Sequence, residues 1–163
     1  HVNLIHCTVM KYLLVRFLCA WLTTYLFASL FHTSSVLYRL TQLDIRITPS
    51  IWLSTVVKDV LGLLPTYGAI IAIALLIGFV VTSPLAKKIA LRSAYKQNER
   101  PILLLGLFAL SGAAALATAL IAMYPILNVT LIAGARGYTG FALQCLAGSM
   151  GGMAFARTHH SYK

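Results

Sequence analysis

Residues 101–125 read PILLLGLFALSGAAALATALIAMYP, and this stretch decides the class of fold. Pro101 and Pro125 bound 23 residues that carry no formal charge. A helix of that length rises about 35 Å, which is enough to cross the hydrocarbon core of a bilayer. The stretch therefore predicts a transmembrane helix.

The composition of the whole chain agrees with this prediction. Of its 163 residues, 60% are hydrophobic and 10% are charged, and the mean hydropathy is +0.85. Soluble domains average about 25% charged residues, and a soluble domain of this size needs more charge to cover its surface. Intrinsic disorder is excluded for the same reason. The composition predicts an integral membrane protein.

Three further apolar stretches are expected to span the bilayer, and the four spans are residues 12–31, 65–82, 101–124 and 137–156. Arg16 interrupts the first stretch, whose alternative interpretation is a cleaved signal peptide; the apolar region of such peptides is only about 7–15 residues long. Residues 1–9 precede a Met-Lys pair and are set apart as a non-native or disordered extension, which leaves 10–163 as a single multi-pass domain. Residues 32–47 are polar and are expected to form an external loop.

A short amphipathic helix is expected between the first two spans. Thr48-Pro49-Ser50 is a helix-start signal, and a polar stripe at helical spacing follows: Ser54, Thr55, Lys58, Asp59 and Gly62. Such a helix is typical of a membrane interface; the alternative is that it packs on the other helices as a lid. A bend is expected at residues 62–65, because an unbroken helix over residues 50–82 would exceed the bilayer.

The predicted fold class is therefore all-α: an integral membrane bundle of about four transmembrane helices with a short interfacial amphipathic helix between the first and second. Three or five spans are the alternatives, if the first stretch is cleaved or the amphipathic helix inserts.

The charge distribution predicts an orientation. Thirteen Lys and Arg against three Asp and Glu give a formal charge of +10, and membrane proteins concentrate such cations in cytoplasmic loops. Residues 83–100 hold the densest group: Lys87, Lys88, Arg92, Lys96 and Arg100. This loop and both termini are expected to be cytoplasmic, in a cell membrane of the bacterial inner-membrane type. The alternative role for Lys87, Lys88, Arg92 and Lys96 is contact with anionic lipid.

Small residues recur at the spacing that lets helices approach closely in lipid. Ala109, Ala113 and Ala117 repeat every four residues, and Gly148 with Gly152 forms a GxxxG pair. We expect these residues to be helix-packing contacts.

No residue pattern indicates catalysis, a metal or a cofactor. Three widely separated cysteines favour neither a disulfide framework nor a zinc site, no histidine lies deep in a span, and no acid lies in any of the four spans. We therefore expect no enzyme activity, no cofactor and no nucleic-acid partner. Gln144 remains, and it either forms an interhelical hydrogen bond, for example to Ser111 or a backbone carbonyl, or lines a polar path with Arg136.

Two functions follow from these features. The first is a structural or accessory protein of a bacterial-type inner membrane, with the lipid bilayer and either itself or a larger membrane complex as partners. The alternative is a small oligomeric transporter or pore that uses the glycine-rich last helix with Arg136 and Gln144.

Overall fold

The computed structural model describes residues 2–42, 48–92, 100–127 and 138–157. These residues confirm the all-α fold class, since they form five α-helices and one π-helical turn. In chain order the elements are α1 (Val2–Thr41), α2 (Pro49–Leu63), η1 (Leu64–Gly68), α3 (Ala69–Arg92), α4 (Arg100–Leu127) and α5 (Tyr138–Arg157).

Three segments are long and apolar enough to cross a membrane: Met10–Thr41, Pro49–Ile89 and Ile102–Met123. They overlap the first three expected spans, and the second segment also includes residues 49–64, where the amphipathic helix was expected. The fourth expected span corresponds to α5, which is 20 residues long but contains Gln144 and four glycines, and is therefore less apolar. Its crossing of the bilayer stays a prediction.

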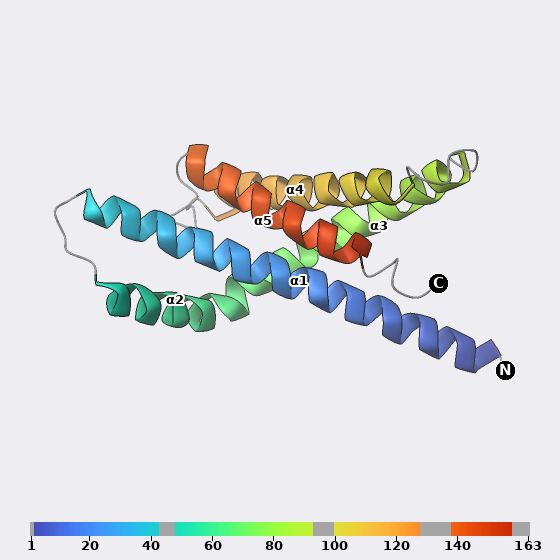
Figure 1. Cartoon of the computed structure of the whole chain (residues 1–163), viewed down its shortest axis with the longest axis horizontal. Helices are drawn as coiled ribbons and strands as arrows, with labels where there is room; N and C mark the ends of the chain where they lie inside the picture. Colours follow the sequence, from blue (N-terminus) through green and yellow to red (C-terminus); the bar gives the residue numbers. More distant parts are fainter. Residues whose placement is uncertain (1, 43–47, 93–99, 128–137, 158–163) are drawn as a thin grey trace.

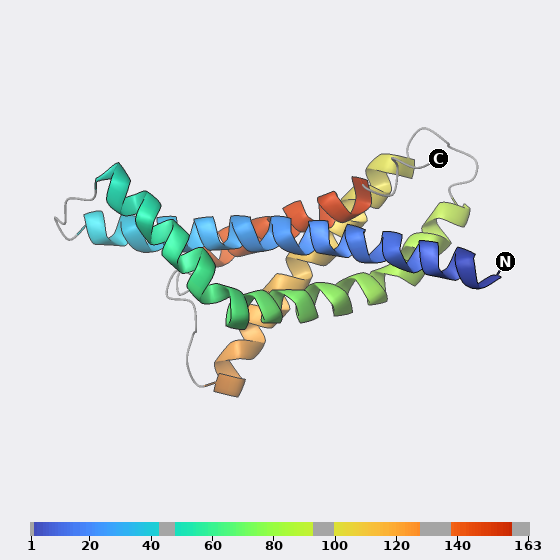
Figure 2. The ribbon, with the colours of Figure 1, turned by 90° about the horizontal axis from the view of Figure 1, so that it is seen from below.

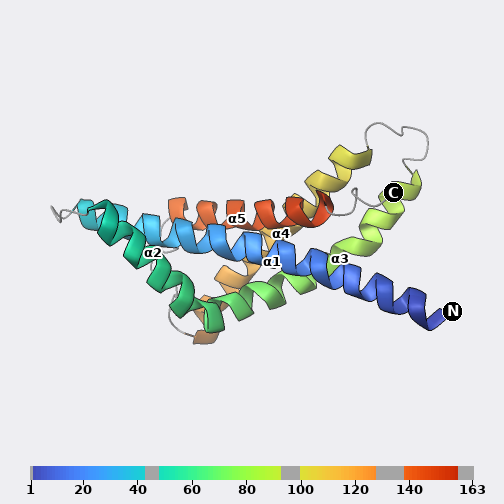
Figure 3. The ribbon, with the colours of Figure 1, turned by 60° about the horizontal axis from the view of Figure 1, so that its bottom comes forward.

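The last helix occupies the centre of the bundle. Figure 1 shows α5 between α4 and α1, and α5 packs closely on both of these helices. On its other side α4 packs on α3, while α2 packs along α1. Figure 3 shows the same order, with α2 and α1 on one side of α5 and α4 behind it. The positions that α5 presents to its neighbours therefore decide how the bundle holds together.

The first helix is longer than the sequence indicates. Residues 32–47 were expected to form a loop, but α1 continues through Thr41, so that expectation is wrong for residues 32–41. The physical reason is tertiary contact: Thr33 and Leu37 are buried in this part of α1. At the other end, α1 begins at Val2, and the separation of residues 1–9 from the membrane domain stays a prediction.

The second helix packs along α1, which favours the alternative that it covers other helices. Val56 is buried, and the polar stripe is divided between two sides of α2, because Asp59 contacts α1 while Lys58 is exposed. Leu53, Val57 and Leu61 are exposed instead. The outward side of α2 thus carries apolar residues, as a lipid-contacting helix does and a water-facing one usually does not.

The expected bend between α2 and α3 is present and lies at η1. Figure 2 shows the change of direction between the two helices. Pro65 lies in this turn, and because proline has no backbone N–H, it interrupts the regular hydrogen-bond ladder. The wider π-helical turn accommodates the missing hydrogen bond, and the direction of the helix changes there.

Candidate functional site

The closest approach in the bundle is between α5 and α4. A Cβ added at Gly148 would overlap the carbonyl oxygen of Gly112 and lie 2.8 Å from its carbon. A Cβ at Gly152 would overlap the carbonyl oxygen of Phe108 and lie 2.6 Å from its carbon. The two backbones therefore touch through glycine positions, which is how small-residue faces bring helices together in lipid.

A second glycine position brings α5 against α1. A Cβ at Gly151 would overlap the Thr24 hydroxyl and lie 2.8 Å from the Ala20 carbonyl oxygen. Ala20, Thr24 and Ala147 are fully buried at this contact. Consequently α5 is packed on two sides by helix backbones, with Gly148 and Gly152 toward α4 and Gly151 toward α1.

The predicted alanine series on α4 lies beside the contact. Ala109 and Ala113 place backbone atoms 3.0 and 3.2 Å from the Cβ positions of Gly152 and Gly148. Ala117 is half-buried. Gly112 of α4 also lies at this contact, because a Cβ added there would overlap the carbonyl oxygen of Gly148, and the sequence analysis did not single it out. The feature that could have identified Gly112 is its spacing: Phe108, Gly112 and Leu116 lie four residues apart on one side of α4, and all three are buried.

Gln144 forms interhelical hydrogen bonds with two other elements. Its exposed fraction is 1%. Its amide nitrogen donates to the carbonyl oxygen of Ala28 on α1 at 3.0 Å, and its amide oxygen accepts from the Tyr67 hydroxyl of η1 at 2.8 Å. These bonds correspond to the interhelical interpretation, with a backbone carbonyl and not Ser111 as acceptor. Ser111 instead accepts a hydrogen bond from Thr82 of α3 at 2.7 Å.

Two aromatic side chains of α1 hold the bend in place. The indole nitrogen of Trp21 donates to the carbonyl oxygen of Gly68 at 2.8 Å, and the Tyr25 hydroxyl donates to the carbonyl oxygen of Val60. The two rings stack with centroids 6.0 Å apart. Each bond satisfies a backbone carbonyl near the irregular turn, and hydrocarbon offers no other partner for such a group.

The Arg16 side chain of α1 contacts the C-terminal end of α5. It is 6% exposed, and its guanidinium donates to the carbonyl oxygen of Phe155 at 2.9 Å. The same guanidinium lies 4.4 Å from the centroid of the Phe155 ring. That ring stacks on Phe79 of α3 at 4.3 Å and lies 5.2 Å from Phe108 of α4. The Arg16 cation of α1 thus meets the negative end of the α5 dipole, over an aromatic cluster that joins the three helices α3, α4 and α5.

The structure describes only some of the cationic and polar residues that the sequence singled out. Lys87 and Lys88 are exposed near the end of α3, and Arg92 ends that helix. Lys96 and Arg136 lie outside the described residues. The position of Arg136 relative to Gln144 is therefore not described, and their role as a polar lining stays a prediction.

The sequence reasoning missed Arg16, Trp21 and Tyr67 as interhelical contacts. Each was visible as a polar atom within an apolar stretch, where hydrocarbon offers no partner. Their partners were not visible, because all three bond to residues that are distant in sequence.

No family model, curated protein or solved structure matches this chain.

Proposed function

We propose that this chain is a non-enzymatic membrane protein that serves as a structural or accessory component of a bacterial-type inner membrane. It acts by presenting apolar helix faces to lipid and to the helices of a partner, which is either a second copy or a larger membrane complex.

The observation that carries this proposal is that buried small and polar residues of α5 contact the other helices of the bundle. The backbone of α5 touches α4 at Gly148 and Gly152, and Gln144 uses both ends of its amide on α1 and η1. Polar groups that are bonded in this way fix the register of a bundle. They support a role in which the outer surface of a rigid bundle makes the functional contacts.

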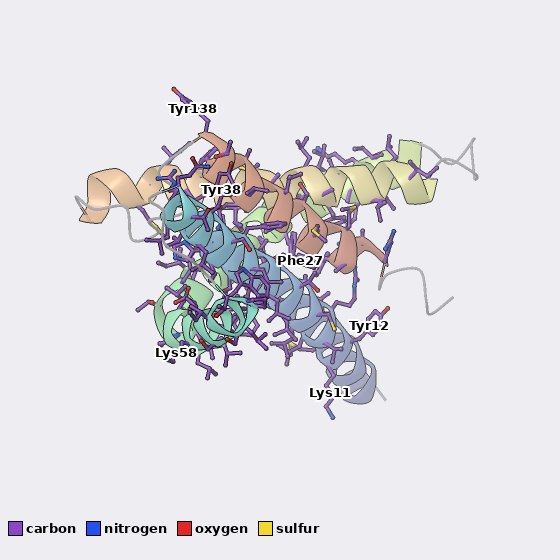
Figure 4. The ribbon with its side chains drawn as sticks, turned by 60° about the vertical axis from the view of Figure 1, so that its left-hand side comes forward. Lys11, Tyr12, Phe27, Tyr38, Lys58 and Tyr138 are labelled. Carbon is purple, nitrogen blue, oxygen red and sulfur yellow. The ribbon has the colours of Figure 1, made fainter. Side chains whose placement is uncertain are left out.

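The polar contacts also support a position for the bilayer. Arg16 and Thr33 are 17 residues apart on α1, which at 1.5 Å per residue is about 26 Å. Arg16 is therefore near one edge of a hydrocarbon core of about 30 Å, and the Thr33–Asp59 pair is near the other. Figure 4 shows Lys11 and Tyr12 toward the N-terminal end of α1, and Tyr38 and Tyr138 far from them, as expected of charged and aromatic residues at two interfaces.

Between these two levels the outer side of α1 is apolar, and α3 and α4 also expose apolar side chains. Leu18, Leu22 and Leu26 form an exposed stripe on α1, with one residue on each successive turn. Comparable side chains on α3 and α4 are Ile73, Leu76, Ile77, Val80, Leu110 and Ile121. Exposed apolar surface of this extent is typical of a protein in contact with lipid or with other helices.

The orientation is part of the proposal. Exposed Lys87 and Lys88 at the end of α3 support a cytoplasmic connection between α3 and α4. If α5 also crosses the bilayer, both termini lie on the cytoplasmic side.

In-membrane photo-crosslinking tests the proposal. A photoreactive amino acid is placed at Leu22 on α1, Val80 on α3 or Leu110 on α4, each of which is exposed. We expect protein adducts from one of these faces and lipid adducts from the others. Lipid adducts alone at all three positions would contradict a partner-binding role.

Solute flux through liposomes tests the alternative. Purified protein is reconstituted, and the release of small ions and neutral solutes is compared with protein-free liposomes. We expect no added flux. Flux that appears with the wild-type chain and falls in Gln144→Leu would instead support a transporter or pore.

A further inference from the structure

The helix contacts determine which helix ends lie together. From Gln144 to Phe155 along α5, the partners on α1 change from Ala28 to Arg16, so α1 and α5 are antiparallel. Figure 1 shows that the start of α1 and the ends of α3 and α5 lie toward the same end of the bundle, and the stacking of Phe79 of α3 on Phe155 agrees with this. Three helices therefore contribute residues to this end.

Four exposed cations lie at this end of the bundle: Lys11 on α1, Lys87 and Lys88 on α3, and Arg157 on α5. We call these four residues the cationic end. The only acid in the described part of the chain is Asp59, which contacts Thr33 toward the opposite end of α1. Residues 93–99 lie outside the described residues and add Lys96 and Glu99, whose formal charges cancel. The cationic end therefore has a net positive charge that fits an anionic partner.

Exposed apolar side chains lie beside the same cations, on the side of the bundle centre. Leu13 and Leu14 follow Lys11 on α1, and Leu85 precedes Lys87 on α3. Cations with leucines within one helical turn of them match the two parts of a phospholipid, which are a charged headgroup and apolar acyl chains. A soluble polyanion would cover only the charges. The surface therefore fits an anionic phospholipid better than it fits a free phosphate or a nucleic acid.

We propose that the cationic end binds the headgroups of anionic phospholipids, an inference that rests on the membrane position proposed above. That position places Arg16 near one edge of the hydrocarbon core. Lys11 is five residues before Arg16, so it lies about 7.5 Å further out along α1, at the depth of the polar headgroups. In the proposed orientation this is the cytoplasmic side, where the leaflet carries anionic lipid. The cations then contact phosphate oxygens, and the leucines contact acyl chains.

Lipid binding by the detergent-purified full chain tests the proposal. Native mass spectrometry measures its affinity for phosphatidylglycerol and for phosphatidylcholine with the same acyl chains, so that the two lipids differ in the charge of the headgroup. We expect tighter binding of phosphatidylglycerol. Equal affinities would overturn the proposal and leave the membrane position untouched. Failure to bind either lipid would overturn the membrane position as well.

A competitor without acyl chains distinguishes a lipid from a free phosphate. Glycerol phosphate has an anionic phosphate group like that of the lipid but no apolar part. We expect it to leave phosphatidylglycerol bound when both are present at the same concentration, because the leucines contact only the lipid. Displacement of the lipid at equal concentration would identify a free phosphate as the ligand and would overturn the proposal.

Neutral variants locate the contact. Lys11→Gln and Arg157→Gln should each lower the affinity ratio of phosphatidylglycerol to phosphatidylcholine by about fivefold, which corresponds to the contribution of about 1 kcal/mol from one cation at an anionic membrane surface. The double variant Lys87→Gln with Lys88→Gln should lower the ratio by about twenty-five-fold. All four side chains are exposed, so the variants should keep the wild-type melting temperature. An unchanged ratio in all of these variants would overturn the proposal.

The opposite end of the bundle supplies matched controls. Arg39 on α1 and Lys58 on α2 are exposed cations in that part of the structure. Arg39→Gln and Lys58→Gln remove the same charge as the test variants and should keep the wild-type affinity ratio. A loss of the same size in these controls would show that net charge alone attracts the lipid, and it would refute a binding surface at the cationic end.

Discussion

A single methyl group added to the α4–α5 contact should destabilise the bundle. In Gly148→Ala the new Cβ would meet the carbonyl group of Gly112, whose carbon lies 2.8 Å from it. Ordinary contacts of a Cβ begin near 3.4 Å, and a backbone carbonyl in a helix cannot turn aside as a long side chain can. The two helices must therefore move apart along their contact, and the dispersion contacts on both sides weaken.

The chain offers a matched control for this substitution. Gly106 lies on α4 and a Cβ there would meet nothing within 4 Å. Gly106→Ala should be neutral or stabilising by up to about 1 kcal/mol, because alanine favours helix more than glycine does. Gly148→Ala gains the same propensity but should lose about 1–3 kcal/mol to overpacking. We expect the two variants to differ by about 2 kcal/mol, a factor of roughly thirty in the unfolding equilibrium.

The assay is unfolding of purified protein in mixed micelles of increasing SDS fraction, followed by far-ultraviolet circular dichroism. Gly112→Ala and Gly152→Ala should resemble Gly148→Ala, because each adds a Cβ that overlaps a backbone carbonyl. Cross-linked oligomer yield is measured on the same samples, so that a loss between subunits is distinguished from a loss within the chain. If Gly148→Ala and Gly106→Ala unfold at the same SDS fraction, the close contact between α4 and α5 is wrong.

Three further predictions concern polar contacts and orientation. A double-mutant cycle of Gln144→Leu and Tyr67→Phe in the same unfolding assay should give a coupling energy of about 0.6 kcal/mol and at most about 1.7 kcal/mol, the average and the maximum measured for hydrogen bonds inside a membrane protein; additive effects would show that the 2.8 Å hydrogen bond contributes nothing. Arg16→Leu should destabilise the chain and Arg16→Lys should restore only part of the loss, because lysine keeps the charge but not the planar stacking on Phe155; full recovery by lysine would mean that charge alone matters. A cysteine at Gln97, with the native cysteines replaced, should resist an impermeant maleimide in intact cells, and efficient labelling there would reverse the proposed orientation.

Apolar stretches determined the number and the approximate place of the long helices. The uncharged residues between Pro101 and Pro125 predicted α4, because composition alone decides whether a stretch of that length prefers lipid to water. Proline near residue 65 predicted the bend at η1, since a missing N–H acts locally. The GxxxG pair at Gly148 and Gly152 indicated a packing side of α5, because that spacing places both residues on one helix face.

Tertiary contact decided the rest. Residues 32–41 have the polarity of a loop, but they continue α1 because α2 packs beside them and Asp59 accepts a hydrogen bond from Thr33. Gln144 was recognisable as a residue that needs a partner, yet its partners, Ala28 and Tyr67, are 116 and 77 residues away in the chain. The sequence by itself determined which groups hydrocarbon would leave unsatisfied, since that depends on residue type and local spacing. Which groups satisfy them was decided only by the tertiary structure, because it depends on the order and register in which α1, η1, α4 and α5 pack together.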